Sequence, residues 1–116
     1  MSNPDCLFCK IVAKTIPAKV VLENEHVVAF EDVRPMAPRH ALVIPKRHIT
    51  GVHDATAGDA ALLGQVVLAA RDAAEKLGLG ESGYRLVMNQ GADGGQSVFH
   101  LHCHVLGGRA MGWPPG

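Results

Sequence analysis

Three histidines alternate with apolar residues between His100 and His104, and no other part of the chain constrains its fold as strongly. Alternate side chains of a β-strand point to the same face. We therefore expect all three imidazoles on one surface, with Leu101 and Cys103 directed into a hydrophobic core. The pattern predicts a half-buried strand over residues 99–106. A solvated strand face that is rich in histidine only by chance is the less favoured interpretation, because histidine occupies all three polar positions.

Adjacent imidazoles are suited to metal binding, or to acid–base and nucleophilic chemistry near neutral pH, because histidine titrates at about 6.5. Neighbouring positive charges lower each other's pKa, so we expect at least one neutral, nucleophilic ring. The glycine-rich loop 91–97 precedes the histidines and lets backbone N–H groups approach an anion, with Ser97 adding a hydroxyl. An ordinary turn is the alternative for this loop. It contains no Lys or Arg, which favours a substrate of modest negative charge over a triphosphate.

The rest of the chain predicts an α+β fold, in which a mostly antiparallel sheet of about five strands is covered by one long helix. Apolar spacing predicts a short helix at 6–14 and the long helix at 56–77. Thr56 and Asp59 are spaced as a capping box, and Gly78 stands where a left-handed residue ends a helix. Further strands are predicted at 20–22, 26–30, 41–44 and 84–88.

Composition restricts the function classes. The 116 residues are expected to form one domain, 1–116, and 47% hydrophobic residues are typical of a globular chain. Eleven Lys and Arg balance eleven Asp and Glu, which disfavours binding to nucleic acid or to an acidic membrane surface. No apolar run approaches the ~20 residues that cross a bilayer, and the N-terminus lacks the features of a secretory signal. We therefore expect a cytoplasmic protein with no nucleic-acid or membrane partner.

The three cysteines are an odd number, and disulfides are not expected in a reducing compartment. Cys6 and Cys9 form a C-x-x-C pair near the N-terminus. No predicted strand precedes the pair, which argues against thioredoxin-like redox chemistry. Such a pair together with two histidines makes a tetrahedral zinc site, while two buried thiols without metal are the alternative. Cys103 is predicted to serve in core packing.

The segment His100–Leu106 matches the histidine triad signature, and the chain resembles the histidine triad (HIT) family, in particular its HINT-type nucleotide-binding proteins. The resemblance covers nearly the whole length. It is carried by Ile16–Lys19, Ala41–Ile49, Asp93–Val98 and the Trp113–Gly116 end, which points to the HINT branch. The resemblance implies a HIT-like fold that forms a homodimer, in which the two sheets join into one continuous larger sheet.

The activity implied by this resemblance is hydrolysis of purine nucleoside 5′-phosphoramidates of the AMP-amine or AMP-lysine type. The nucleophile would be His102, which forms a nucleotidyl-histidine that water then cleaves. The other residues that match catalytic positions are His100, His104, His40 and Ser97. His40 would steady the triad by hydrogen bonding, and His104 would contact the phosphate or the departing group. Two other classes stay open: a purine-nucleotide-binding regulatory protein with negligible turnover, and a zinc-stabilised interaction module.

The resemblance also implies where a purine mononucleotide binds. Asp32 would receive both ribose hydroxyls, which suits a carboxylate with several acceptor sites. His102, His104, Asn89, Gly95, Gln96 and Ser97 would lie on the phosphate side. The apolar walls around the base would be Leu7, Phe8, Ile11, Phe30, Val33 and Leu42, with simple core packing as the alternative. For structural zinc, the resemblance adds His48 and His100 to Cys6 and Cys9, which puts a catalytic role of His100 in doubt.

Overall fold

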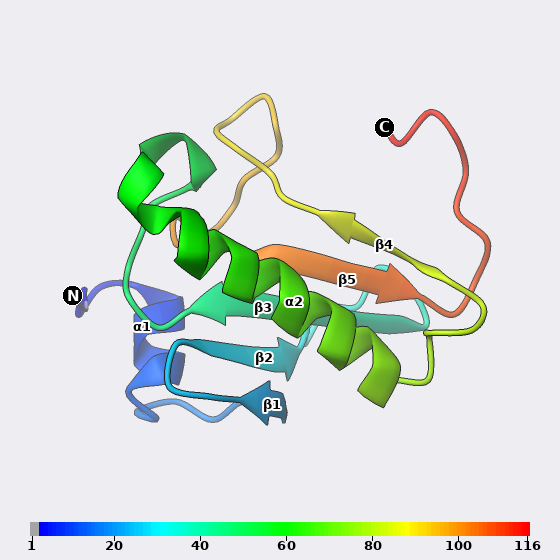
Figure 1. Ribbon diagram of the computed structural model, residues 1–116, viewed down its shortest axis with the longest axis horizontal. Helices are drawn as coiled ribbons and strands as arrows, with labels where there is room; N and C mark the ends of the chain where they lie inside the picture. The colour runs from blue at the N-terminus through cyan, green and yellow to red at the C-terminus, as the bar shows by residue number, and fades with distance from the viewer. Residues whose placement is uncertain (1–2) are drawn as a thin grey trace.

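The computed structural model describes residues 3–116, so Met1 and Ser2 of the expected 1–116 domain lie outside the described residues. Five strands form one sheet in the order β1-β2-β3-β5-β4, and every neighbouring pair is antiparallel (Figure 1). The elements are α1 (Leu7–Val12), β1 (Val20–Glu23), β2 (Val27–Glu31), β3 (Arg39–Pro45), α2 (Ala60–Lys76), β4 (Tyr84–Val87) and β5 (Cys103–Gly107). This arrangement confirms the predicted α+β fold.

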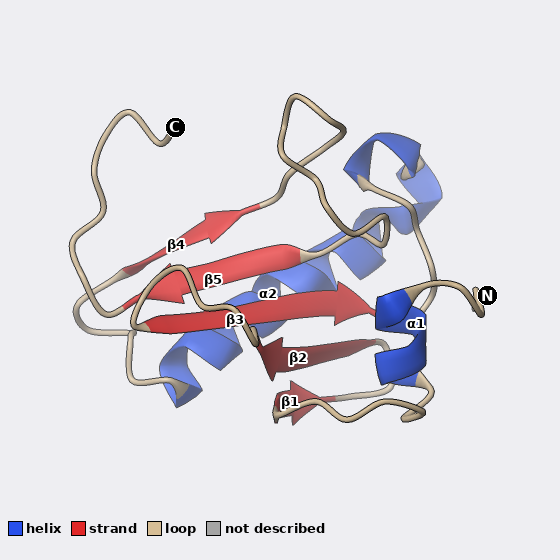
Figure 2. Cartoon of the chain, turned by 180° about the vertical axis from the view of Figure 1, so that it is seen from behind, coloured by secondary structure: helices blue, strands red, loops and turns tan. Residues whose placement is uncertain are grey.

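The two faces of the sheet bury different side chains of the same strands. On one face, α2 packs against alternate residues of β2, β3 and β5, among them Ala29 and Val43 (Figure 1). On the other face, Val28 and Ile44 form a smaller cluster with Phe8 of α1, which lies beside one end of the sheet (Figure 2). Because β3 is buried on both faces, its sequence is continuously apolar rather than alternating.

The capping box and the left-handed Gly78 are present at the two ends of the long helix, but the α-helix itself begins four residues later than predicted. Asp59 Oδ2 accepts the Thr56 backbone N–H at 2.9 Å, which closes the capping box on a single 3₁₀ turn, and α2 begins at Ala60. Gly78 follows the helix with a φ of 78°, a conformation that glycine adopts without strain. The helix turns small residues such as Ala73 toward the sheet, while Val67 is exposed.

The last strand is shorter than predicted. Regular pairing with β3 ends at Val43 and Cys103, so residues 99–102 precede the strand proper. Pro45 has no N–H to extend the ladder at this end of β3, which accounts for the early stop. The alternation survives nonetheless, because Leu101 and Cys103 are buried in the core beneath α2, as predicted. Within residues 3–116 no helix is both long enough and apolar enough to cross a membrane.

Candidate functional site

A cavity of about 450 Å³ opens on the face of the sheet opposite α2, and both His102 and His104 line it. Its size falls in the range of small-molecule sites, about 300–1,000 Å³. The predicted site residues that line it are Leu7, Phe8, Ile11, Phe30, Asp32, Val33, Leu42, Ser97, His102 and His104. Of the apolar residues, Phe8, Phe30 and Leu42 also belong to the smaller core cluster. These three side chains therefore form the cavity wall and pack the core at the same time. Val33 is almost fully exposed at the rim.

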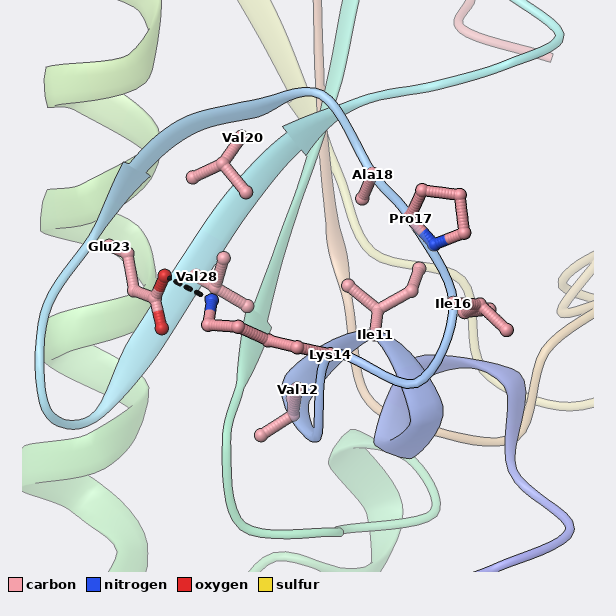
Figure 3. Close-up of a pocket in the computed structure, with 9 residues that line it drawn as sticks. All are labelled: Ile11, Val12, Lys14, Ile16, Pro17, Ala18, Val20, Glu23 and Val28. Atoms are coloured by element: carbon pink, nitrogen blue, oxygen red, sulfur yellow. Dashed lines mark hydrogen bonds and ion pairs between the residues drawn. The ribbon is translucent and has the colours of Figure 1, made fainter.

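A smaller hollow of about 190 Å³ adjoins this cavity behind the segment Ile16–Ala18 (Figure 3). Ile11 and this segment line both spaces. At the opposite side of the hollow, the Lys14 ammonium pairs with the Glu23 carboxylate at 2.9 Å. None of its lining residues is a histidine, whereas His102 and His104 line the larger cavity. The lining role of Ile16–Ala18 was not predicted, because these residues lie in a loop without periodicity.

The His102 ring is held in one tautomer. Its Nδ1 lies 2.8 Å from the backbone oxygen of His100, and a carbonyl oxygen only accepts hydrogen bonds, so Nδ1 carries the proton. In the neutral ring, the Nε2 nitrogen then carries a free lone pair. Phe8 packs edge-on against the imidazole at 5.2 Å between centroids, and the residue is only 6% exposed. The ring is therefore fixed at the wall of the cavity, and in its neutral form its Nε2 lone pair is available there.

A chain of hydrogen bonds fixes the tautomer of His104 in the same way. The backbone N–H of Met36 donates to Nδ1 of His40 at 3.0 Å, so a neutral His40 carries its proton on Nε2. That Nε2–H lies 2.9 Å from Nδ1 of His104, which accepts it. His104 is left with its proton on Nε2, and this N–H is the polar group that it offers to the cavity. Sequence reasoning missed the part of Met36, because no side-chain motif marks a backbone donor in a loop.

Burial keeps these two rings neutral. Desolvation, with smaller contributions from the neighbouring His102 and His40, lowers the pKa of His104 to about 4 against the opposing effect of Asp32. Desolvation also lowers the pKa of His40, again opposed by the Asp32 carboxylate, which lies 3.5 Å from its Nε2. Near pH 7 His40 and His104 are thus neutral, and His104 offers a hydrogen-bond donor to the cavity.

The glycine-rich loop places only Ser97 in the cavity; Asn89, Gly95 and Gln96 do not line it. The backbone N–H groups of Gly95 and Gln96 bond within the loop, at 3.0 Å each, and are not free for an anion. The buried Gln96 amide accepts from the Gly91 N–H at 2.9 Å and donates to the Thr50 carbonyl at 2.8 Å. Gln96 therefore braces the loop. The expected cradle of backbone donors is not formed by these two amides.

A second cluster brings together the predicted zinc ligands. The side-chain donors of Cys6, Cys9, His48 and His100 all lie within 4.8 Å of one another. Nδ1 of His100 is 3.1 Å from Nδ1 of His48 and 3.4 Å from Sγ of Cys6, and the Cys9 sulfur is 3.3 Å from Nδ1 of His48. Two sulfurs and two imidazole nitrogens at this spacing are the donor set of tetrahedral zinc. The cluster anchors α1, because Cys6 precedes the helix and caps it by accepting the Cys9 N–H.

The tautomer of His100 also fits a metal ligand. Its Nε2 lies 2.8 Å from the Pro45 carbonyl oxygen and must carry the proton, so Nδ1 presents a lone pair to the cluster. A carbonyl behind a ligating histidine is the usual outer support of a metal site. Burial lowers the pKa of His100 to about 4, which keeps the ring neutral. His100 is fully buried and does not line the 450 Å³ cavity, and its ring lies with the cysteines instead.

A third group, Asp32, His40 and His104, lies equally close together but does not suit a metal. The Met36 N–H forces the proton of His40 onto Nε2, the atom that would have to bind the ion. This group is therefore a hydrogen-bonded chain. Cys103, in contrast to the other two cysteines, is buried in the core, and burial raises the pKa of its thiol to about 11, as a packing residue requires.

Comparison with known proteins places this geometry in a family. The sequence model of the HIT domain matches residues 13–111. An uncharacterized HIT-like protein of Synechocystis sp. is 50% identical over 97% of both chains, and a 14 kDa zinc-binding protein of Zea mays is 48% identical over 100% of this chain and 91% of its own. A crystal structure of a HIT family hydrolase from Legionella pneumophila superimposes with a TM-score of 0.94 at 51% identity, covering 97% of this chain and all of the other. The chain therefore belongs to the histidine triad (HIT) family.

Proposed function

We propose that the protein is a hydrolase that cleaves the P–N bond of purine nucleoside 5′-phosphoramidates through a nucleotidyl-histidine intermediate on His102. The observation that carries the proposal is the His102 imidazole, whose proton is held on Nδ1 by a carbonyl at 2.8 Å while the ring lines a cavity of mononucleotide size. The naming of the Legionella pneumophila relative as a hydrolase supports the reaction class.

In the first step, Nε2 of His102 attacks the α-phosphorus and the P–N bond breaks. The amine leaves after taking up a proton from water. His104 is neutral at pH 7, and a neutral imidazole is far too weak an acid to protonate an amine, so we assign its Nε2–H to a non-bridging phosphate oxygen. A fixed donor aimed at developing charge stabilises the transition state. Water then cleaves the nucleotidyl-histidine and releases the mononucleotide.

The cavity walls divide between the parts of a nucleotide. We place the base against the apolar side chains around Phe8 and Phe30, and the ribose hydroxyls at Asp32. Asp32 accepts the Arg34 N–H at 2.9 Å through Oδ1, which leaves further acceptor sites on the carboxylate. The phosphate is placed beside the Ser97 hydroxyl. For Asn89, Gly95 and Gln96, support of the loop that carries this serine fits the geometry better than direct phosphate contact.

We further propose that Cys6, Cys9, His48 and His100 hold a zinc ion with a structural role. Four protein ligands would leave no open position for substrate, so the ion would supply folding energy and no catalytic chemistry. The zinc-binding name of the Zea mays relative supports the assignment.

The cysteines of residues 3–116 are all free thiols, which fits the expected cytoplasmic location.

We propose a homodimer because one edge of the sheet is open to pairing. β4 is an edge strand, and the C-terminal tail runs beside it (Figure 1). Leu86 on β4 and Met88 just after it expose apolar side chains along this edge. An exposed edge strand with apolar side chains is a template for pairing with another strand. Pairing two copies about a two-fold axis would give the continuous larger sheet that we expect.

The test is to incubate the purified protein with adenosine 5′-phosphoramidate and to measure AMP and ammonia. We expect the His102→Ala variant to lose at least about 10²–10⁴-fold in turnover while it still binds AMP, the scale for removal of a catalytic side chain. Equal turnover by both proteins would disprove the nucleophile. Tight AMP binding without turnover would favour the regulatory nucleotide-binding protein, and absence of AMP binding would favour the interaction module.

A further inference from the structure

The smaller hollow of about 190 Å³ shares a wall with the active-site cavity (Figure 3). This wall consists of Ile11 on α1 and of the loop segment Ile16–Ala18, which line both spaces. An apolar cavity of about 150 Å³ holds a benzene molecule. The smaller hollow therefore has room for one aromatic ring or for a branched alkyl chain of similar size.

The lining of the smaller hollow favours an apolar occupant. Its apolar residues beyond the shared wall are valines from three elements, Val12, Val20 and Val28. The charged residues among its described lining are Lys14 and Glu23, which pair with each other at 2.9 Å, and the Glu23 carboxylate also accepts from Lys46 at 2.7 Å. These charges satisfy one another at the end of the hollow away from the cavity, so none is left to bind a charged group.

The shared wall is fastened at its ends and not between them. Thr15 donates its backbone N–H and its hydroxyl to the Lys10 carbonyl, at 3.0 Å and 3.1 Å. On the other side, the Lys19 carbonyl accepts the Glu31 N–H at 2.9 Å. Within residues 3–116, the backbone groups of the segment Ile16–Ala18 make no hydrogen bond to other backbone groups. A shift of the half-buried Ile16 side chain therefore joins the two spaces without breaking a hydrogen bond.

The smaller hollow borders the part of the cavity that we assign to the base. Ile11 is one of the predicted base walls, whereas Asp32, Ser97 and His102 are not among the described lining residues of the hollow. In an adenine nucleotide the ribose is attached to N9, and the exocyclic N6 lies on the edge of the purine away from it. A substituent on N6 is therefore the part of the ligand that extends towards the hollow.

We infer, on the basis of the proposed purine-nucleotide site, that the smaller hollow is a subsite for an apolar group carried on N6 of an adenine nucleotide, and that displacement of Ile16 admits this group. The ligand class is that of N6-alkyl and N6-arylalkyl adenine nucleotides. The group lies far from the phosphate, so the bonds formed and broken at phosphorus are the same as in the proposed reaction.

The test measures the Kd values of AMP, N6-methyl-AMP and N6-benzyl-AMP by calorimetry on the intact zinc-loaded protein. Full burial of a phenyl ring corresponds to roughly tenfold to a hundredfold in affinity. We expect N6-benzyl-AMP to bind about tenfold tighter than AMP, at the low end of this range, because Ile16 has to be displaced. N6-methyl-AMP should bind within about twofold of AMP, because a single methyl group is too short to fill the hollow.

Variants on the two sides of the shared wall change the ratio of the AMP and N6-benzyl-AMP Kd values in opposite directions. Val20→Phe fills the hollow from β1 and should bring the ratio down to about one. Ile16→Ala opens the wall and should raise the ratio by about threefold, because the cost of displacing the side chain is removed. Val67→Phe is the matched control and should keep the ratio of the unmodified protein, since Val67 is 47% exposed, as Val20 is, and lines neither space.

Three results would contradict these expectations in different ways. N6-benzyl-AMP that binds the unmodified protein no tighter than AMP, or a gain that survives Val20→Phe, would overturn the subsite. An unchanged ratio in Ile16→Ala would overturn the role of Ile16 in admitting the group. Failure of AMP itself to bind the unmodified protein would instead contradict the purine-nucleotide site of the proposed function, and the subsite with it.

Discussion

Replacing Phe8 with alanine is expected to lower the free energy of unfolding and to loosen the packing between His100 of the proposed zinc cluster and His102 at the cavity. The Phe8 ring is 4% exposed and packs edge-on against three rings, with centroids 5.5 Å from Phe30, 5.9 Å from His100 and 5.2 Å from His102. Burial of such a ring is worth about 3–5 kcal/mol on truncation to alanine. Part of the ring borders the open cavity, so water can enter the space that truncation leaves. We therefore expect a loss of about 3 kcal/mol in the free energy of unfolding, at the lower end of that range.

The assay is urea unfolding of the zinc-loaded protein, with Phe8→Leu as the conservative control, for which we expect about 1 kcal/mol. Phe8 and the proposed zinc cluster hold the same helix α1, so loss of either one should let the helix detach. The losses from Phe8→Ala and Cys9→Ser should therefore not add, and the double variant should fall short of the sum by about 1 kcal/mol or more. A loss below about 1 kcal/mol for Phe8→Ala, or additive losses, would refute this account of how α1 is held.

Three further predictions follow from the hydrogen-bonded groups. Met36→Pro removes the N–H that sets the tautomer of His40 and should lower kcat about 2–10-fold, the worth of one hydrogen bond, whereas Met36→Ala keeps the N–H and should stay near the unmodified rate. Burial lowers the pKa of His104 from 6.5 to about 4, so the unfolded chain binds more protons than the folded protein between these two pH values. The melting temperature should therefore fall as the pH drops from 6.5 towards 4. In His104→Asn this fall should be less steep. Gln96→Ala breaks the brace of the glycine-rich loop and should cost about 2 kcal/mol in urea unfolding, with faster amide exchange at residues 91–97; unchanged exchange there would contradict the bracing role.

The alternation at His100–His104 was enough to predict which side chains enter the core and which share the opposite face, because the period of a strand fixes that division. It was not enough to assign the histidines to one site. His100 turns to the cysteines while His102 and His104 line the cavity, and this divergence depends on where the strand pairing stops. That stop reflects Pro45 on the neighbouring strand, which sequence alone does not pair with residue 101.

The C-x-x-C pair indicated a metal site from spacing, but His48 entered only through the resemblance to the family. The distance between residue 48 and α1 is a property of tertiary packing that no local pattern carries. The same holds for the Met36 N–H, which acts across a loop on the buried His40. Local sequence signals correctly predicted the capping box at Thr56, the left-handed Gly78 and the short strands, because each of these features depends on neighbouring residues.

The most direct test of the proposed mechanism is acid-quench mass spectrometry within the first turnover of adenosine 5′-phosphoramidate. We predict a nucleotidyl adduct on the peptide that contains His102, located on that imidazole by fragmentation and absent from His102→Ala. Rapid AMP release with no adduct on this peptide, or an adduct that persists in the variant, would contradict the claim that the His102 lone pair is the nucleophile.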